Sequence, residues 1–263
     1  MSVLNYLEST SSSLVLSSNE LSNITASINT IGNRINTYFG SHVKEHFKFG
    51  SSTRGTILPR KYDNSSDIDY LVIFDNYNNY KPQTLLNQLK GFVEKYYSKS
   101  EIHQSHPTMV LELLHIKFEL VPAMKDDGGT ISIPSSLSGY SDWMTTDLNG
   151  FNSKLTTANV NNKSLIKPLV RLMKYWNVKK VDRGYSSFEL EKWIIERSFY
   201  GYNNLKDYLF KCIDDLSYNC DTWQYIKTAV DNAKKIVNNV RQYEKYGKTA
   251  SAESEIKKLI PAL

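Results

Sequence analysis

The hydrophobic pattern of this 263-residue chain changes character at about residue 150, and that change limits the folds it can adopt. Before this point, short apolar runs typical of strands are mixed with apolar residues at helical spacing. Beyond it, every strong pattern has helical spacing, at residues 165–178, 187–199, 205–216 and 222–243. We therefore predict an α+β region over residues 1–155 and a helical C-terminal domain over residues 156–263.

A long amphipathic helix is predicted near the N-terminus. Ser17 and Glu20 have capping-box spacing, and apolar residues then recur at steps of three and four up to Tyr38. Gly40 is a suitable residue to end this helix. The Ser/Thr-rich residues 9–13, which precede it, are expected to form a loose turn.

Strand patterns lie in the same region. Residues 67–74 are rich in β-branched and aromatic residues, which predicts one strand. Residues 108–121 predict two adjacent strands, broken near His115 and ended by Pro122. Between these patterns, Pro82 opens a predicted amphipathic helix.

Composition narrows the class of protein. Hydrophobic residues make up 40% of the chain and charged residues 22%, which is ordinary for a globular protein with a core. The two cysteines, Cys212 and Cys220, are too few for a zinc site of their own or a disulfide framework. The chain shows neither a membrane-length apolar run nor a signal-peptide pattern, so we expect a cytoplasmic protein without membrane contact.

The first candidate for chemistry is the pair Asp67 and Asp69, at the start of a predicted strand. Alternate side chains of a strand point to the same side, so these carboxylates are expected to lie close together. Two unpaired carboxylates repel each other and raise each other's pKa. A divalent cation removes that cost, and hard oxygen ligands suit Mg²⁺ or Mn²⁺. Alone, such a pair is more often two exposed aspartates.

Gly50 and Ser51 lie upstream, between a short predicted strand at residues 47–49 and a short predicted helix. This arrangement offers backbone N–H groups and a hydroxyl to a phosphate. Turns use Gly-Ser frequently, so the pair alone has no value as evidence. Ahead of a strand with paired aspartates it becomes specific.

A Gly-Ser turn, a spacer and two acids on a strand resemble the DNA polymerase β-like nucleotidyltransferase superfamily, whose members take a third acid from a neighbouring strand. The string IKFELVPA resembles that segment in cyclic-oligonucleotide synthases and offers Glu119, where aspartate is commoner. Glu112 is the alternative third acid, but the proline three residues after Glu119 favours Glu119. The spacer is long, and its residues 59–66 suggest an extra loop.

Two strings of the C-terminal half resemble the same group of enzymes. LIKPLVRLMKYWN resembles the helix that supplies a triphosphate-binding lysine, here Lys174. A helix would place Lys174 on one face with Lys167 and Arg171, a pattern that is usually a solvated basic face. YSSFELE resembles the segment whose serine binds phosphate and whose next residue stacks on a base, here Ser187 and Phe188.

In combination, these residues resemble the bacterial cGAS/DncV-like nucleotidyltransferases, or CD-NTases, over nearly the whole chain. The resemblance implies a polymerase β-like core braced by the long N-terminal helix, and two Mg²⁺ or Mn²⁺ ions held by Asp67, Asp69 and Glu119. It also implies that nucleoside triphosphates are joined into a cyclic di- or trinucleotide during phage infection. This messenger activates a separate effector, in the anti-phage system called CBASS.

Other interpretations stay open at this point. The chain could be another terminal or protein-modifying nucleotidyltransferase, or an inactive nucleotide- or RNA-binding module. The net charge of +5 permits a polyanionic partner without requiring one. An activating phage RNA could use a basic set of residues, although solubilising charge explains them more simply. That set comprises Lys44, His46, Lys48, Lys163, Lys179, Lys180 and Arg183.

Overall fold

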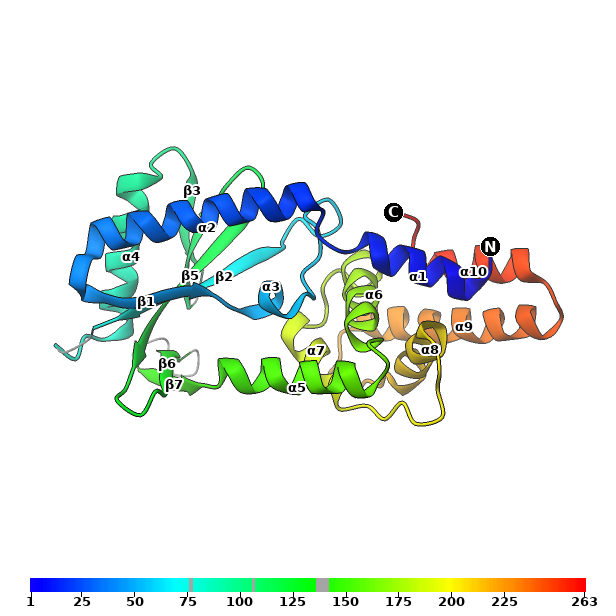
Figure 1. Ribbon diagram of the computed structural model, residues 1–263. Helices are drawn as coiled ribbons and strands as arrows, with labels where there is room; N and C mark the ends of the chain where they lie inside the picture. Colours follow the sequence, from blue (N-terminus) through cyan, green and yellow to red (C-terminus); the bar gives the residue numbers. More distant parts are fainter. Residues whose placement is uncertain (76–77, 106, 136–141) are drawn as a thin grey trace. The chain divides into compact units, whose positions relative to one another are not determined.

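The computed structural model describes residues 1–75, 78–105, 107–135 and 142–263. The chain divides into two compact units, each with its own packing (Figure 1). The sheet unit comprises residues 17–60 and 64–153. The helical unit comprises residues 1–16, 61–63 and 154–263.

The sheet unit is built on a mixed sheet with the strand order β1-β2-β5-β4-β3. Strands β6 and β7 continue from β5, since β6 pairs with both β5 and β7. The strands are β1 (Val43–Lys48), β2 (Asp67–Phe74), β3 (Glu101–Ser105), β4 (Thr108–Glu112), β5 (Lys117–Lys125), β6 (Ile131–Pro134) and β7 (Trp143–Thr146). Its helices are α2 (Ser18–Phe39), the short α3 (Gly50–Arg54) and α4 (Pro82–Tyr96); α5 (Leu148–Asn161) begins in this unit.

The two faces of the central strands have different neighbours. On one face, Phe74 of β2 packs against Phe39 of α2, which in turn contacts Phe92 of α4. On the opposite face, Leu71 of β2 and Val121 of β5 belong to a small apolar cluster. Because side chains alternate along a strand, Asp67 and Asp69 share this second face with that cluster.

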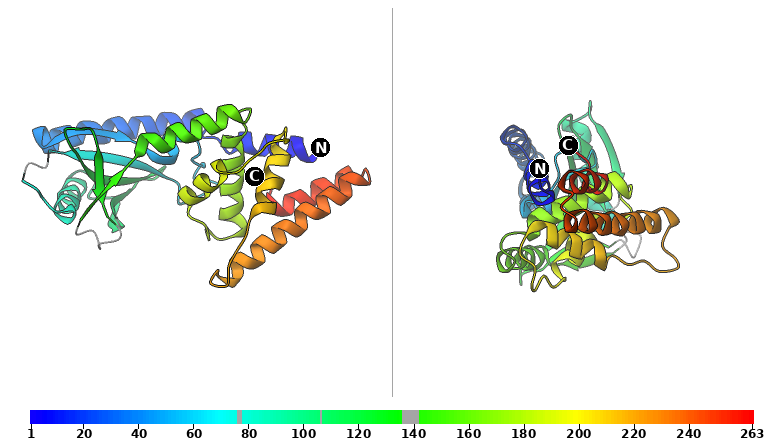
Figure 2. Two further views of the ribbon diagram at one scale, coloured as in Figure 1. Left: turned by 90° about the horizontal axis from the view of Figure 1, so that it is seen from below. Right: turned by 90° about the vertical axis from the view of Figure 1, so that its right-hand side faces the viewer.

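The helical unit packs around α6 (Ile166–Lys180), whose Trp176 is almost fully buried. Its other helices are α1 (Val3–Ser13), α7 (Ser187–Ile195), α8 (Leu205–Asp215), α9 (Gln224–Lys245) and α10 (Thr249–Leu259). Helices α9 and α10 form a hairpin that turns at Gly247, a residue with positive φ (Figure 2). The Tyr6 hydroxyl of α1 donates to the carbonyl of Ile260 at 2.7 Å.

The predicted N-terminal helix is confirmed, whereas the prediction of a loose turn before it is wrong. Helix α2 has the full capping box of Ser17 and Glu20 and ends at Gly40. Residues 9–13 form part of α1 and not a loose turn, because Leu7 and Thr10 are buried in the helical unit. Residues 1–16 therefore belong with the helical unit and not with the sheet.

The strands also extend beyond their predicted ends. The two strands predicted within residues 108–121 are present as β4 and β5, but β5 passes through Pro122 to Lys125. The antiparallel strand β4 pairs with β5 only as far as Leu120. Proline has no N–H group, but at position 122 this costs no hydrogen bond to β4. The mixed sheet and the helical region agree with the predicted α+β fold class.

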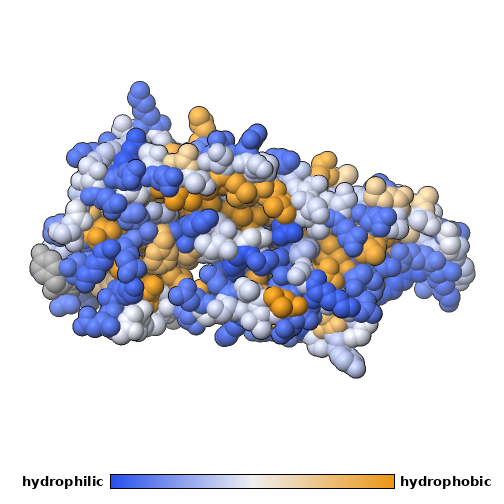
Figure 3. All heavy atoms as spheres, in the orientation of Figure 1, coloured by the Kyte–Doolittle hydropathy of each residue, from blue (hydrophilic) through white to orange (hydrophobic). Residues whose placement is uncertain are grey.

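Hydrophilic side chains are spread over most of the face seen in Figure 3. Among the described residues, none of the helices combines the length and the apolar character needed to cross a membrane.

Candidate active site

The three predicted carboxylates lie on two neighbouring strands of the sheet unit. Strands β2 and β5 pair in parallel, with Asp69 opposite Glu119 and Asp67 opposite Lys117. Residues opposite each other in neighbouring strands point to the same face, so these side chains form one group. The acidic group of Asp67, Asp69 and Glu119 is thus assembled by strand register and stands beside the apolar cluster of the same face.

Gly50 lies directly against Asp69. A Cβ atom built on Gly50 would come 1.8 Å from Oδ2 of Asp69, far closer than atoms can approach. Gly50 also has φ +70°, in the left-handed region that favours glycine. The glycine of the Gly-Ser turn is therefore required both by its backbone conformation and by the carboxylate packed upon it. Ser51 follows within α3 and is partly exposed.

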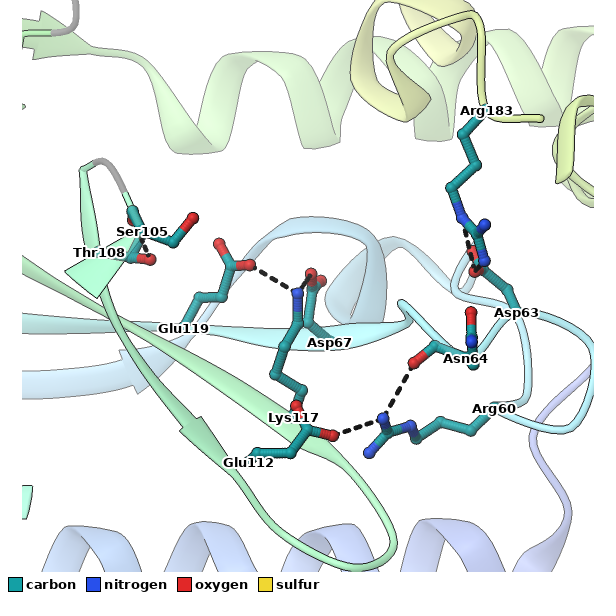
Figure 4. A network of polar contacts seen from close by, with 10 residues as sticks. All are labelled: Arg60, Asp63, Asn64, Asp67, Ser105, Thr108, Glu112, Lys117, Glu119 and Arg183. Atoms are coloured by element: carbon teal, nitrogen blue, oxygen red, sulfur yellow. Dashed lines mark hydrogen bonds and ion pairs between the residues drawn. The ribbon is translucent and has the colours of Figure 1, made fainter. Parts of the chain in front are cut away.

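Lys117 joins two of the acids (Figure 4). Its ammonium Nζ lies 2.9 Å from Oε1 of Glu119 and 3.2 Å from Oδ2 of Asp67. Burial, and next the charge of Glu119, raise the pKa of Asp67 to about 6, although Lys117 opposes the shift. Burial alone would lower the pKa of Lys117, but its hydrogen bonds and charge interactions with both acids raise it.

The alternative third acid, Glu112, has a different partner. It ends β4 and accepts a hydrogen bond from Nη2 of Arg60 at 2.5 Å. The same guanidinium donates to the carbonyl of Asn64 at 2.9 Å, so Arg60 closes the loop that precedes β2 (Figure 4). Glu112 thus anchors a loop, and Glu119 is the acid that stands in register with Asp69.

The raised pKa of Asp67 predicts a pH-dependent stability. Asp67 has its ordinary pKa of 3.8 in the unfolded chain and a pKa of about 6 in the folded protein. At pH values between these two, the folded protein binds more protons than the unfolded chain, so this group lowers the stability of the protein as the pH rises. Asparagine resembles the protonated carboxyl. In chelator, the gain in Tm of Asp67→Asn over the parent should be small near about pH 4 and largest above about pH 6. Thermal unfolding across this range tests it, with Asp127→Asn in an exposed turn as control; a constant difference would contradict the assignment.

Lys174 occupies a buried position in the helical unit. Its Nζ lies 2.5 Å from Oε1 of Glu191 on α7, and the two side chains are 7% and 0% exposed. Arg171, one turn earlier, is also buried and donates from Nε to the carbonyl of Ser11 at 3.2 Å. The expectation of a solvated basic face is therefore wrong for Arg171 and Lys174, because α1 and α7 pack against this side of α6.

Ser187 and Phe188 begin helix α7. Ser186 is its N-cap, and its hydroxyl accepts a hydrogen bond from the amide of Glu189. Phe188 is 46% exposed, which leaves much of its ring accessible. Asn177 of α6 holds the preceding turn through both the amide and the carbonyl of Tyr185. The predicted phosphate- and base-binding residues therefore belong to the helical unit, whereas the acids and Gly50-Ser51 belong to the sheet unit.

The long spacer between Ser51 and Asp67 contains the predicted extra loop. Residues 61–63 belong to the helical unit, although the chain on both sides belongs to the sheet unit. Asp63 accepts hydrogen bonds from Arg183 at 2.7 and 3.2 Å (Figure 4). Lys117 and Glu191 belong to none of the motifs in the sequence, but Lys117 shares the strand period with Glu119, which places both side chains on one face.

Comparisons with solved structures support the fold. The chain is similar to the Vibrio cholerae DncV cyclic AMP-GMP synthase, a prokaryotic cGAS homolog, with 10% identity, TM-score 0.77 and coverage of 95% of this chain and 92% of the other. CdnC of Escherichia coli MS115-1, solved with ATP, has 14% identity and TM-score 0.67, with 94% of each chain covered. The CdnE c-di-GMP synthase of Capnocytophaga granulosa has 18% identity and TM-score 0.67, with 92% and 87% covered.

No curated protein matches the sequence. The model of the Second Messenger Oligonucleotide or Dinucleotide Synthetase domain family matches residues 1–159, which include the Gly-Ser turn and all three acids. Together with the fold and the acidic group in register on β2 and β5, this match places the chain in the Second Messenger Oligonucleotide or Dinucleotide Synthetase family of CD-NTase nucleotidyltransferases.

Proposed function

We propose that this nucleotidyltransferase joins nucleoside triphosphates into a cyclic di- or trinucleotide at the acidic group of the sheet unit. The observation that carries the proposal is the register of β2 and β5, which sets Glu119 opposite Asp69 with Asp67 on the same face. Such a group is costly to bury without a cation, and burial already raises the pKa of Asp67 to about 6.

The chemistry of these side chains fits Mg²⁺ or Mn²⁺. The acidic group offers hard carboxylate oxygens, and the Lys117 ammonium bound between two of them supports the proposal of a cation site at this position. We propose Asp67, Asp69 and Glu119 as the ligands of two ions. When bound, the ions would lower the pKa of an attacking hydroxyl and neutralise charge on the phosphates.

The remaining roles belong to the chain's own residues. Gly50 keeps the backbone close to Asp69 and leaves room for its carboxylate. We propose that Ser51, Ser187 and Lys174 bind the triphosphate and that Phe188 stacks on a base. Relatives solved with nucleotides support these substrates: CdnC was solved with ATP, and the Bradyrhizobium diazoefficiens CD-NTase CdnG with GTP.

A product assay tests the reaction. Purified protein is incubated with all four nucleoside triphosphates and Mg²⁺ or Mn²⁺, treated with phosphatase and analysed by mass spectrometry. A phosphatase-resistant cyclic product is expected. Linear tailing of an RNA, or a nucleotide attached to a protein, would instead identify another type of nucleotidyltransferase.

The buried pair of Lys174 and Glu191 shapes the test of the lysine. Lys174→Ala should weaken binding of all four triphosphates alike, but it also breaks the buried ion pair with Glu191, which costs about 3–5 kcal/mol of stability. The double variant Lys174→Met/Glu191→Gln should recover stability without recovering nucleotide affinity. Isothermal titration and thermal unfolding measure the two effects, and full nucleotide affinity in the double variant would refute the role.

Phe188→Ala is the complementary variant. Stacking contributes about 1–3 kcal/mol per base, so removal of the ring should change the ranking of the four nucleotides. Because Phe188 is half-exposed, the fold should tolerate the change. An equal loss for all four nucleotides would contradict base stacking.

We propose that the messenger acts in the cytoplasm, where nucleoside triphosphates are abundant, and activates a separate effector in anti-phage defence. An activating phage RNA has weaker support. Lys44 pairs with Asp75 and Arg183 with Asp63, while burial lowers the pKa of His46. Product formation with and without structured RNA, at low and high salt, tests it, because phosphate contacts are strongly salt-dependent. Full activity without RNA, unchanged by its addition at low salt, would refute RNA activation.

A further inference from the structure

Lys117 is a cationic side chain bonded to two acids of the candidate active site. Its ammonium lies 2.9 Å from Glu119 and 3.2 Å from Asp67, two of the three proposed metal ligands (Figure 4). The Lys117 side chain is only 20% exposed, so these contacts are partly shielded from water.

The backbone directs Lys117 toward this position. It stands opposite Asp67 on β2, as Glu119 stands opposite Asp69. These four side chains, three acidic and one basic, therefore share one face of the sheet. Its other cross-strand neighbour is Glu112 of β4, which is already bonded to the Arg60 guanidinium. The Lys117 ammonium is therefore directed to Asp67 and Glu119.

The Lys117 ammonium reduces the net negative charge that this group offers to a metal ion. Three ionised carboxylates and one ammonium leave two negative charges in excess, whereas the acids alone would carry three. As they stand, no three Asp, Glu, His or Cys side chains among the described residues could together hold a metal ion. A divalent ion that bound Asp67 and Glu119 would meet the repulsion of a nearby ammonium.

We propose that Lys117 is a built-in counter-cation that holds the metal-free site together and must be displaced when a divalent ion binds. This inference rests on the metal site proposed above. Lys117 then stabilises the protein without metal and weakens its affinity for free metal. Nucleotide-bound metal has an advantage, because the phosphates bring negative charge that offsets the ammonium.

Mn²⁺ binding to the metal-free protein tests the proposal without any measurement of activity. Free Mn²⁺ is followed by electron paramagnetic resonance, and thermal unfolding is measured in chelator. Lys117→Met removes the charge, and Lys117→Gln removes it while keeping an N–H donor for the acids. Lys125→Met is the matched control, since Lys125 lies on the same strand but pairs with Glu45 at 2.7 Å.

The two uncharged variants should bind Mn²⁺ about tenfold or more tightly than the parent, because a unit charge a few ångströms away is removed. Lys117→Met should also lower the Tm in chelator, whereas Lys125→Met should leave Mn²⁺ affinity unchanged. The control is Asp67→Asn/Asp69→Asn, which should lose the Mn²⁺ binding that the parent shows. If it does, unchanged or weaker Mn²⁺ binding in both Lys117 variants would overturn the proposal. If the parent binds no Mn²⁺ that depends on these aspartates, the proposed metal site fails first, and this inference fails with it.

Discussion

Replacing Asp67 and Asp69 together by asparagine is expected to abolish product formation while the protein stays folded. The two carboxylates share one face of β2 beside Glu119, so the change removes two of the three proposed ligands. Loss of a metal's charge stabilisation, several kcal/mol, corresponds to a rate decrease of about a thousandfold or more. The Tm in chelator should not fall, because repulsion among the acids is relieved.

The matched control is Asp126→Asn/Asp127→Asn, which removes the same two charges from an exposed turn of the sheet unit. This variant should keep the parent's rate, measured by pyrophosphate release. A rate near that of the parent in the Asp67→Asn/Asp69→Asn protein would exclude these residues as metal ligands.

The second large effect is expected for Gly50→Ala. The new Cβ would lie 1.8 Å from Oδ2 of Asp69, at a backbone φ of +70° that alanine adopts only with strain. Either the backbone of the Gly-Ser turn or the Asp69 carboxylate must move. A displacement of about 1 Å at a reacting centre can cost about a hundredfold in rate. We expect at least that loss in kcat, with a lower Tm.

Gly55→Ala distinguishes the effect of backbone strain from the effect of steric overlap with a side chain. Gly55 has nearly the same φ, +71°, but a Cβ atom added there would meet nothing within 4 Å. It should show only the conformational cost of about 1–2 kcal/mol and keep most of the activity. If the two alanine variants behave alike in kcat, the contact with Asp69 is not what requires a glycine at position 50.

Local sequence patterns were sufficient for several elements and for part of the site. Helix α2, with its capping box and Gly40 end, follows from apolar spacing and caps within one segment. The common face of Asp67 and Asp69 follows from the period of a single strand. Only the proline context of a family resemblance favours Glu119 over Glu112, because no local rule of physical chemistry distinguishes these two acids.

Tertiary structure decided what depends on pairing between distant segments. The parallel register of β2 and β5 brings Glu119 and Lys117 beside the aspartates, and strand register cannot be read from either segment alone. The burial of Lys174 against Glu191 depends on how α7 packs on α6. The sequence pattern of α6 predicts a solvated basic face, whereas the packing of α7 places Lys174 in a buried ion pair. The sequence by itself determined which residues could carry the chemistry, because residue type and local period are properties of one segment. Only the fold determined their partners, because burial and charge pairing arise where segments meet.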